Sequence, residues 1–186
     1  MTMKEVLDKM RDLASQSLKT LETVYDFHTK GEVTWAFTTN VNDHIWLLKD
    51  EIEERKHVLS QEYEKLMLEV ETEVNKQFSD ISDNIQYSLG RNKYWENKVQ
   101  LRYIDIYISN TEGFRIGWIH DDDELELALL YDNGSWEEIE VWLEEDENGE
   151  HRYDYLHLCE LKHGIPKLVS YMREAWDKYM RQSEEN

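Results

Sequence analysis

The chain has 186 residues, enough for one ordinary domain, or for a small domain with a helical extension, that buries a core without disulfides or metal. Seven Trp and eleven Tyr supply ample apolar material, which argues against global disorder. The formal charge of -20, from 41 acidic and 21 basic side chains, argues against direct binding to nucleic acid or anionic lipid, because phosphate contacts need Lys and Arg.

The compartment follows from what the sequence does not contain. Cys159 is the single cysteine and cannot form an internal disulfide. The first residues carry charges at short intervals instead of the apolar core of a signal peptide, and no apolar run approaches the ~20 residues that a membrane span needs. We expect a cytoplasmic protein, located in the host cytoplasm if a phage encodes it.

A first helix is predicted from about Thr2 to Thr29. Its seam positions recur at spacings of four and three, the a/d pattern of paired helices. They are Met3, Leu7, Met10, Ala14, Ser17, Leu21 and Val24. Residues 32–41 are β-branched and aromatic without a helical period, which predicts a partly extended connector.

A second helix is predicted from a cap at Asn42 or Asp43 to Leu89, with Gly90 as its C-terminal cap. A helix of that length outruns a compact domain. We therefore expect it to pair with the first helix, to pair with a second chain, or to break within residues 79–83. A helical hairpin and a dimeric coiled coil both stay open, because the seam lacks the clean heptads that would decide between them.

From residue 98 the apolar period changes to two, which predicts an antiparallel meander with one face toward solvent. Strands are expected over 102–108, 114–120, 124–129 and 138–143, with 151–158 as a candidate last strand, and a turn is expected at SNTEG, residues 109–113.

The turn at residues 132–134 decides the register of the last hairpin of this meander. A two-residue loop would place Leu127 opposite Glu140 and mix core and solvent positions on one face. A three-residue loop ending in a glycine bulge aligns Leu127 with Ile139 instead, and this register is predicted. The acidic positions that then share the exposed face are Glu124, Glu126, Glu138 and Glu140.

A C-terminal amphipathic helix is predicted from Ile165, because Pro166 suits the first turn of a helix. Its apolar stripe is Ile165, Leu168, Val169, Met172, Trp176, Tyr179 and Met180. The predicted fold class is α+β: a long N-terminal helical hairpin, a four- or five-stranded antiparallel sheet and this helix. We expect residues 1–90 to form the helical region and residues 91–186 the α+β domain with an acidic sheet face.

The acidic stretch from Asp121 to Glu150 holds 14 Asp or Glu and no Lys or Arg. Its simplest interpretation is a solvated face that keeps the protein soluble. Like charges opposite each other across strands cost stability, however, and two Trp of the kind that anchors interfaces stand among them. The candidate partner-binding residues are Asp121, Asp122, Asp123, Glu124, Glu126, Trp136, Glu138, Glu140, Trp142, Glu144, Glu145, Asp146 and Glu147.

Other constellations carry weaker signals. His157, Cys159 and His163 cannot all align on one helix or strand face, and their spacing is wider than zinc sites prefer. Residues 144–149 resemble a calcium-binding loop, but Tyr155 then stands where the bidentate Glu must be. We expect no metal, no cofactor and no enzymatic activity.

The favoured function is that of a binding protein that inhibits or occupies a basic, nucleic-acid-binding surface of another protein. Carboxylates arrayed on a rigid sheet can imitate a row of phosphates. Phage-encoded inhibitors of restriction and CRISPR systems are small acidic proteins of this kind, an analogy of charge and size alone. The alternatives are an immunity protein or adaptor for a basic toxin and, in another class, an enzyme or metal site around Cys159, His157 and His163. A homodimer through the N-terminal helices is also considered.

Overall fold

The computed structural model describes residues 1–30, 38–92, 98–119, 124–132, 135–139, 144–145, 151–152 and 158–184. Its helices are α1 (Met3–Lys30), α2 (Thr38–Leu59), α3 (Gln61–Gln77) and α4 (Leu158–Glu184). Its strands are β1 (Gln86–Asn92), β2 (Lys98–Tyr107), β3 (Gly113–Ile119), β4 (Glu124–Leu130), β5 (Trp136–Glu138), β6 (Glu144–Glu145) and β7 (His151–Arg152). The chain has the predicted α+β fold.

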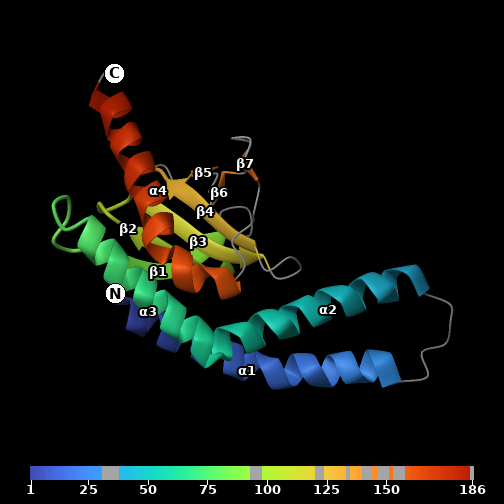
Figure 1. Cartoon of the computed structure of the whole chain (residues 1–186). Helices are drawn as coiled ribbons and strands as arrows, with labels where there is room; N and C mark the ends of the chain where they lie inside the picture. The colour runs from blue at the N-terminus through green and yellow to red at the C-terminus, as the bar shows by residue number, and fades with distance from the viewer. Residues whose placement is uncertain are drawn as a thin grey trace.

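Strands β1 to β5 form one antiparallel sheet in sequence order, and β6 pairs with β7. Helices α1, α3 and α4 pack on one face of the five-stranded sheet (Figure 1). The opposite face is called the outer face below. Strand alternation therefore assigns each residue of the sheet either to the helix layer or to the outer face.

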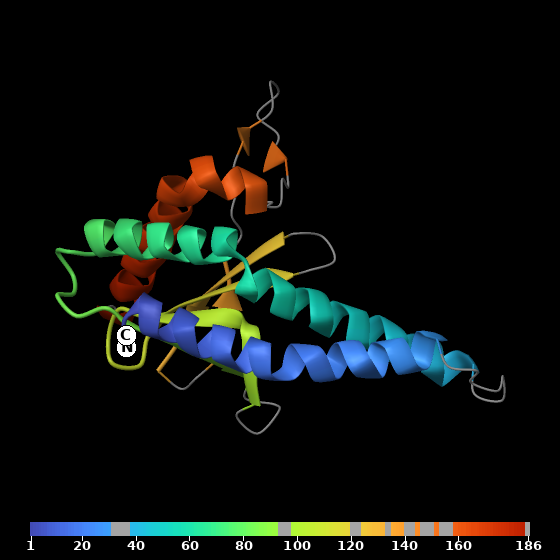
Figure 2. The same ribbon diagram turned by 90° about the horizontal axis from the view of Figure 1, so that it is seen from below.

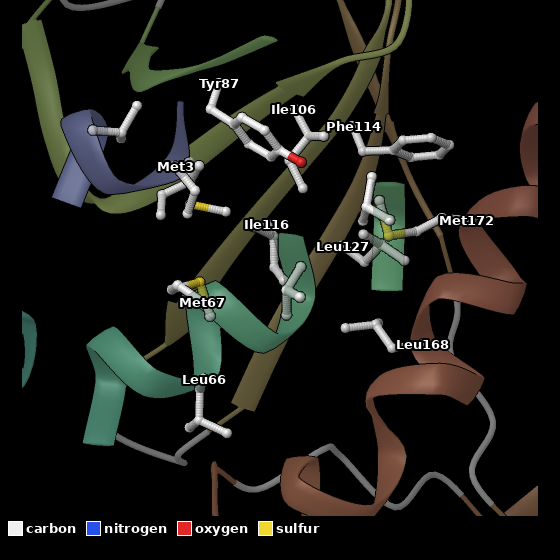
Figure 3. Packing of buried hydrophobic residues seen from close by; sticks show 14 of the residues in the cluster. Met3, Leu66, Met67, Tyr87, Ile106, Phe114, Ile116, Leu127, Leu168 and Met172 are labelled. Atoms are coloured by element: carbon white, nitrogen blue, oxygen red, sulfur yellow. The ribbon is translucent and has the colours of Figure 1, made fainter. Parts of the chain in front are cut away.

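The core lies between the sheet and the helix layer. Figure 3 shows Met3, Leu66 and Leu168, from three different helices, near the strand residues Ile106 and Ile116. All five are buried. The core cluster draws on residues from both predicted ranges, 1–90 and 91–186, and the predicted boundary falls within β1.

Helices α1 and α2 form an antiparallel hairpin that extends past the sheet (Figure 2). Arg55 Nε donates a hydrogen bond to Ser17 Oγ across the seam at 2.7 Å. The predicted seam is wrong at Val24, which is exposed, while Tyr25 is half-buried. A straight helix has about 3.6 residues per turn and therefore drifts away from a strict seam of about 3.5. Within one chain, α1 thus has α2 as its partner.

The sequence left open whether the helix from residue 43 to Leu89 is continuous, with a break within residues 79–83 as one alternative. The structure has two helices, of which α3 ends at Gln77, close to that range, and a break at Ser60 that was not predicted. The helix is interrupted at Ser60, whose Oγ accepts a hydrogen bond from the N–H of Tyr63 at 3.1 Å and so caps α3. Helix α3 ends at Gln77, and the following residues 86–92 form β1. The spacing of Ile81, Ile85 and Leu89 is helical, but pairing with β2 imposes the strand.

Gly90 is therefore a strand residue and does not cap a helix. A Cβ at this position would lie 2.3 Å from the Cβ of Tyr103 on β2, so only glycine fits against that neighbour. The glycine allows β1 and β2 to approach at the point where their register shifts between Leu89 and Arg91.

The register predicted for the β4–β5 hairpin is confirmed. Tyr131 N–H donates to Ser135 O at 3.0 Å and closes a loop over residues 132–134. Ile139 N–H donates to Leu127 O at 2.8 Å, which aligns these two residues as expected. The turn at 109–113 is confirmed as well, since Ile108 N–H donates to Glu112 O.

The C-terminal helix begins earlier than predicted. It starts at Leu158, so Pro166 lies inside α4 and removes one helix hydrogen bond. The predicted apolar stripe is otherwise right, since Leu168, Met172 and Trp176 are buried, although Met180 is exposed. None of the helices in the described residues is both long and apolar enough to cross a bilayer.

Some predictions fall on residues that the structure does not describe. Of the predicted connector 32–41, residues 38–41 begin α2 instead, and the rest lies outside the described residues. The strand expected over 138–143 is β5, which begins at Trp136, and 140–143 lie outside. Of the candidate last strand, only 151–152 are described, in β7.

Candidate functional site

The sheet register arranges the outer face in rows that cross the strands. One row joins Tyr103, Gly117 and Glu126 as successive Cα partners on β2, β3 and β4. A second row runs through Ser88, Asp105, Arg115, Ala128 and Glu138, from β1 to β5.

A third row joins Tyr107, Gly113, Leu130 and Trp136. Asp105 on β2 is one acidic position of these rows, and the other two, Glu126 and Glu138, lie on β4 and β5. We call this β4–β5 unit, residues 124–139, the acidic hairpin.

The first row holds the carboxylate of Glu126 in place. Gly117 has no side chain between Tyr103 and Glu126, and a Cβ there would lie 2.2 Å from the ring carbon Cδ1 of Tyr103. The Tyr103 ring therefore lies across β3 and its hydroxyl donates a hydrogen bond to Glu126 Oε2. Tyr103 thus holds the side chain of Glu126 through one oxygen, and a carboxylate has a second oxygen that can also accept hydrogen bonds.

The hydrogen bond also affects the titration of Tyr103. Burial and the hydrogen bond to Glu126 raise the pKa of Tyr103 to about 12. An unfolded tyrosine titrates near pH ~10. The protonated phenol therefore contributes stability that is fully present below pH ~10 and is lost as the pH rises through the folded pKa.

We therefore expect Tyr103→Phe to lose less stability than the wild type between pH ~10 and ~12, measured by urea unfolding at each pH. Glu126→Gln serves as the control, because it keeps the phenol but removes the carboxylate and so should bring the pKa of Tyr103 closer to its ordinary value. Superimposable stability curves for Tyr103→Phe and the wild type over this range would contradict the assignment.

The second row contains a buried ion pair. Asp105 is 3% exposed, although it stands on the outer face. Arg115 donates to both of its oxygens, from Nε to Oδ1 at 2.7 Å and from Nη2 to Oδ2 at 2.9 Å. Nη2 also donates to the carbonyl of Arg91 at 3.0 Å. Burial raises the pKa of Asp105, and the hydrogen bonds from Arg115 oppose that effect.

The sequence predicted that this face is exposed to solvent along its whole length. In the structure, part of the outer face is buried. Ala128 and Leu130 on β4 are buried, as is Asp105 on β2. Trp136 is exposed on the outer face, with 54% of its surface accessible, whereas Glu137, the Cα partner of Leu129, is exposed on the side of the helices. Glu137 accepts a hydrogen bond from the hydroxyl of Tyr131.

The predicted site residues are only partly described. Glu126 and Trp136 have described side chains. The backbones of Glu124, Glu138, Glu144 and Glu145 lie in β4, β5 and β6, and their side chains are outside the described part. The predicted residues outside the described ranges altogether are Asp121, Asp122, Asp123, Glu140, Trp142, Asp146 and Glu147.

The structure brings neither metal ligands nor a cysteine site together in the part that it describes. No group of three or more His, Cys, Asp or Glu able to hold a metal ion occurs among those residues. Cys159 and His163 lie in α4 with side chains outside the described part, and His157 lies outside it as well.

The chain matches no protein-family model, no curated protein and no solved structure.

Two features of this face did not emerge from the sequence reasoning. One is the hydrogen bond by which Tyr103 holds Glu126, and the other is the ion pair of Arg115 with Asp105. Tyr103, Asp105 and Arg115 belong to strands that precede the acidic stretch. A usable signal was present for the second, because the turn at 109–113 sets the register of β2 and β3 and so aligns Asp105 with Arg115.

A second exposed surface lies on the helical hairpin. Phe27, Trp46 and Leu47 have 69%, 60% and 59% of their surface accessible, the highest values among the exposed large hydrophobic side chains of the described residues. Phe27 lies near the C-terminal end of α1 and the other two near the start of α2, so all three stand at the end of the hairpin far from the sheet (Figure 1). Exposed apolar groups of this size are typical of interaction surfaces.

Proposed function

We propose that this protein binds a basic, nucleic-acid-binding surface of another protein through the acidic hairpin, and that it inhibits or occupies that surface. The observation that carries the proposal is the row of Tyr103, Gly117 and Glu126, which fixes a carboxylate on the outer face of a rigid sheet. A fixed carboxylate loses little side-chain entropy when a cation binds to it.

Three further observations support the proposal. The register places Glu124, Glu126 and Glu138 at outer-face positions of one hairpin. Trp136 is exposed at the end of the same hairpin and offers the aromatic surface that interfaces favour. The net charge of -20 steers the chain toward cationic partners.

Charge reversal at Glu126 and Glu138 of the acidic hairpin, together with Glu140 directly after it in the sequence, tests the proposal. We expect the variant Glu126→Lys/Glu138→Lys/Glu140→Lys to lose captured partner, with affinity falling about 100-fold or more, because like charges across an interface cost several kcal/mol. The measurement is an affinity capture from host lysate, eluted with a salt gradient, followed by titration of the captured partner with the purified variant. Wild-type binding should weaken steeply with salt.

A matched control separates position from net charge. Asp8, Glu22 and Glu174 are exposed on the helices, and reversing these three to Lys changes the net charge by the same amount. This variant is expected to retain most of the affinity. The proposal is refuted if the wild type and the acidic-hairpin variant bind the partner with equal affinity. If both variants lose affinity equally, the partner responds to net charge and not to the acidic hairpin.

We also propose that the chain forms a homodimer through the helical hairpin, supported by the exposed Phe27, Trp46 and Leu47 at its far end. Light scattering should then give twice the chain mass for the wild type. Phe27→Ser/Leu47→Ser should shift the protein toward the monomer, while Lys19→Ser, at another exposed position of α1, should not. A wild-type monomer at high protein concentration would refute the homodimer.

A further inference from the structure

Arg115 stands directly beside the acidic hairpin. Its Cα partners are Asp105 on β2 and Ala128 on β4, and the next residue of the same row is Glu138 on β5. Adjacent strands lie about 4.8 Å apart, so an arginine side chain can extend toward either neighbour. On the β4 side it would pass over Ala128, whose side chain is a single methyl group, toward the acidic hairpin.

The guanidinium nevertheless turns the other way. Both of its hydrogen bonds to Asp105 and its bond to the carbonyl of Arg91 direct it toward β2 and β1. Within the described residues, Glu126 has its hydrogen bond from Tyr103 and no ion pair with Arg115. Arg115, which shares a row with Ala128 and Glu138 of the acidic hairpin, is thus occupied elsewhere.

We infer that Asp105 is a positioning residue which holds Arg115 away from the acidic hairpin and so keeps the carboxylates of the hairpin free for a cationic partner. The inference rests on the proposed function. Without Asp105, Arg115 can turn along its own row toward Glu138 and toward the neighbouring row of Glu126, and it would compete with an arginine or lysine of the partner for the same oxygens.

The geometry of the pair suits this role. Two parallel hydrogen bonds between a guanidinium and a carboxylate fix the direction of the arginine as well as its charge. Asp105 is nearly fully buried and the side chain of Arg115 is 15% exposed, so water screens their attraction little. A surface ion pair between the same residue types would not hold the guanidinium in one direction.

The test measures binding of an oligo-arginine peptide at low salt by fluorescence anisotropy. Asp105→Asn should weaken binding about two- to fivefold, the range that one added cation gives at a partly exposed site. Asp105→Asn/Arg115→Gln should restore wild-type affinity, because the competing cation is then absent. Arg115→Gln alone should bind about as tightly as the wild type, because Arg115 is already held away from the carboxylates.

Each outcome decides the inference. The inference is refuted if Asp105→Asn binds the peptide as tightly as the wild type. It is also refuted if the double variant binds as weakly as Asp105→Asn, because removing Arg115 does not repair a structural defect. Should Asp105→Asn not fold, an unchanged affinity in Arg115→Gln would support the inference, and a clear gain or loss would refute it. Circular dichroism and binding stoichiometry establish that each variant is folded.

A further variant distinguishes failure of the proposed function from failure of the role inferred for Asp105. If Glu126→Lys/Glu138→Lys binds the peptide as tightly as the wild type, the acidic hairpin is not the binding surface, and both ideas fail together. If that variant loses binding while Asp105→Asn does not, only the role of Asp105 is refuted.

Discussion

Replacing Phe114 by alanine is expected to lower the free energy of unfolding by about 4 kcal/mol, the upper part of the range for large-to-small changes in a core. Phe114 is fully buried on β3 and contacts two other aromatic rings. Its ring centroid lies 5.9 Å from that of Phe78 and 6.1 Å from that of Trp176. The ring therefore joins the sheet to the end of α3 and to α4, and its loss leaves a cavity where three elements meet.

Urea denaturation measures the effect, with an unchanged slope showing that the folded state is as compact as before. Met180→Ala is the control. It also truncates a large apolar side chain, at a position of α4 that is 40% exposed, and the expected loss is about 1 kcal/mol or less. A loss at Phe114 no larger than at Met180 would contradict the packing described for β3, α3 and α4.

Gly113→Ala is expected to cost about 3 kcal/mol, the high end for overpacking. A Cβ at this position would lie 1.9 Å from the carbonyl oxygen of Ile106 and 2.9 Å from the Cα of Tyr107. Both are backbone atoms of β2, so the methyl group can be accommodated only if the two strands separate. Gly113 begins β3 and pairs with Tyr107, and the start of that strand should be lost.

Gly117→Ala offers a comparison on the same strand. The atoms nearest to a Cβ at Gly117 belong to the ring of Tyr103, a side chain that can rotate away. The expected loss of stability is about 1 kcal/mol, the low end of the same range, and the hydrogen bond from Tyr103 to Glu126 should be broken. Thermal or urea unfolding compares the two variants. Equal losses at both glycines would show that the backbone contact at Gly113 has no special cost.

Local sequence predicts which acidic residues lie on the outer face. The contacts of their side chains depend on the assembled sheet. The loop at residues 132–134 could be predicted from local sequence, because its length decides whether Leu127 meets Ile139 or a glutamate, and only one choice keeps apolar residues together. The positions of Glu124, Glu126 and Glu138 on one face follow from that choice. The number of acidic residues and the negative charge follow from the composition alone.

The side-chain contacts and the burial of the outer face could not be predicted from local sequence. Whether Glu126 is held by Tyr103, and whether Arg115 turns toward Asp105 or toward the acidic hairpin, depends on side chains from three strands. Burial of Ala128 and Leu130 likewise depends on what packs over the outer face. Alternation along a strand gives only the side to which a residue belongs.

The sequence by itself determined the α+β class, the first helix, the meander with its turns, and the concentration of negative charge, because these follow from local periodicity, turn chemistry and composition. Only the tertiary structure decided that residues 86–92 form a strand, that Pro166 lies within α4, and that Arg115 is occupied by Asp105. For residues 86–92, pairing with β2 overrides the helical spacing, since burial and pairing contribute more free energy than intrinsic propensity. The direction of Arg115 depends on the assembled sheet, because Asp105 and the carbonyl of Arg91 lie on two different strands.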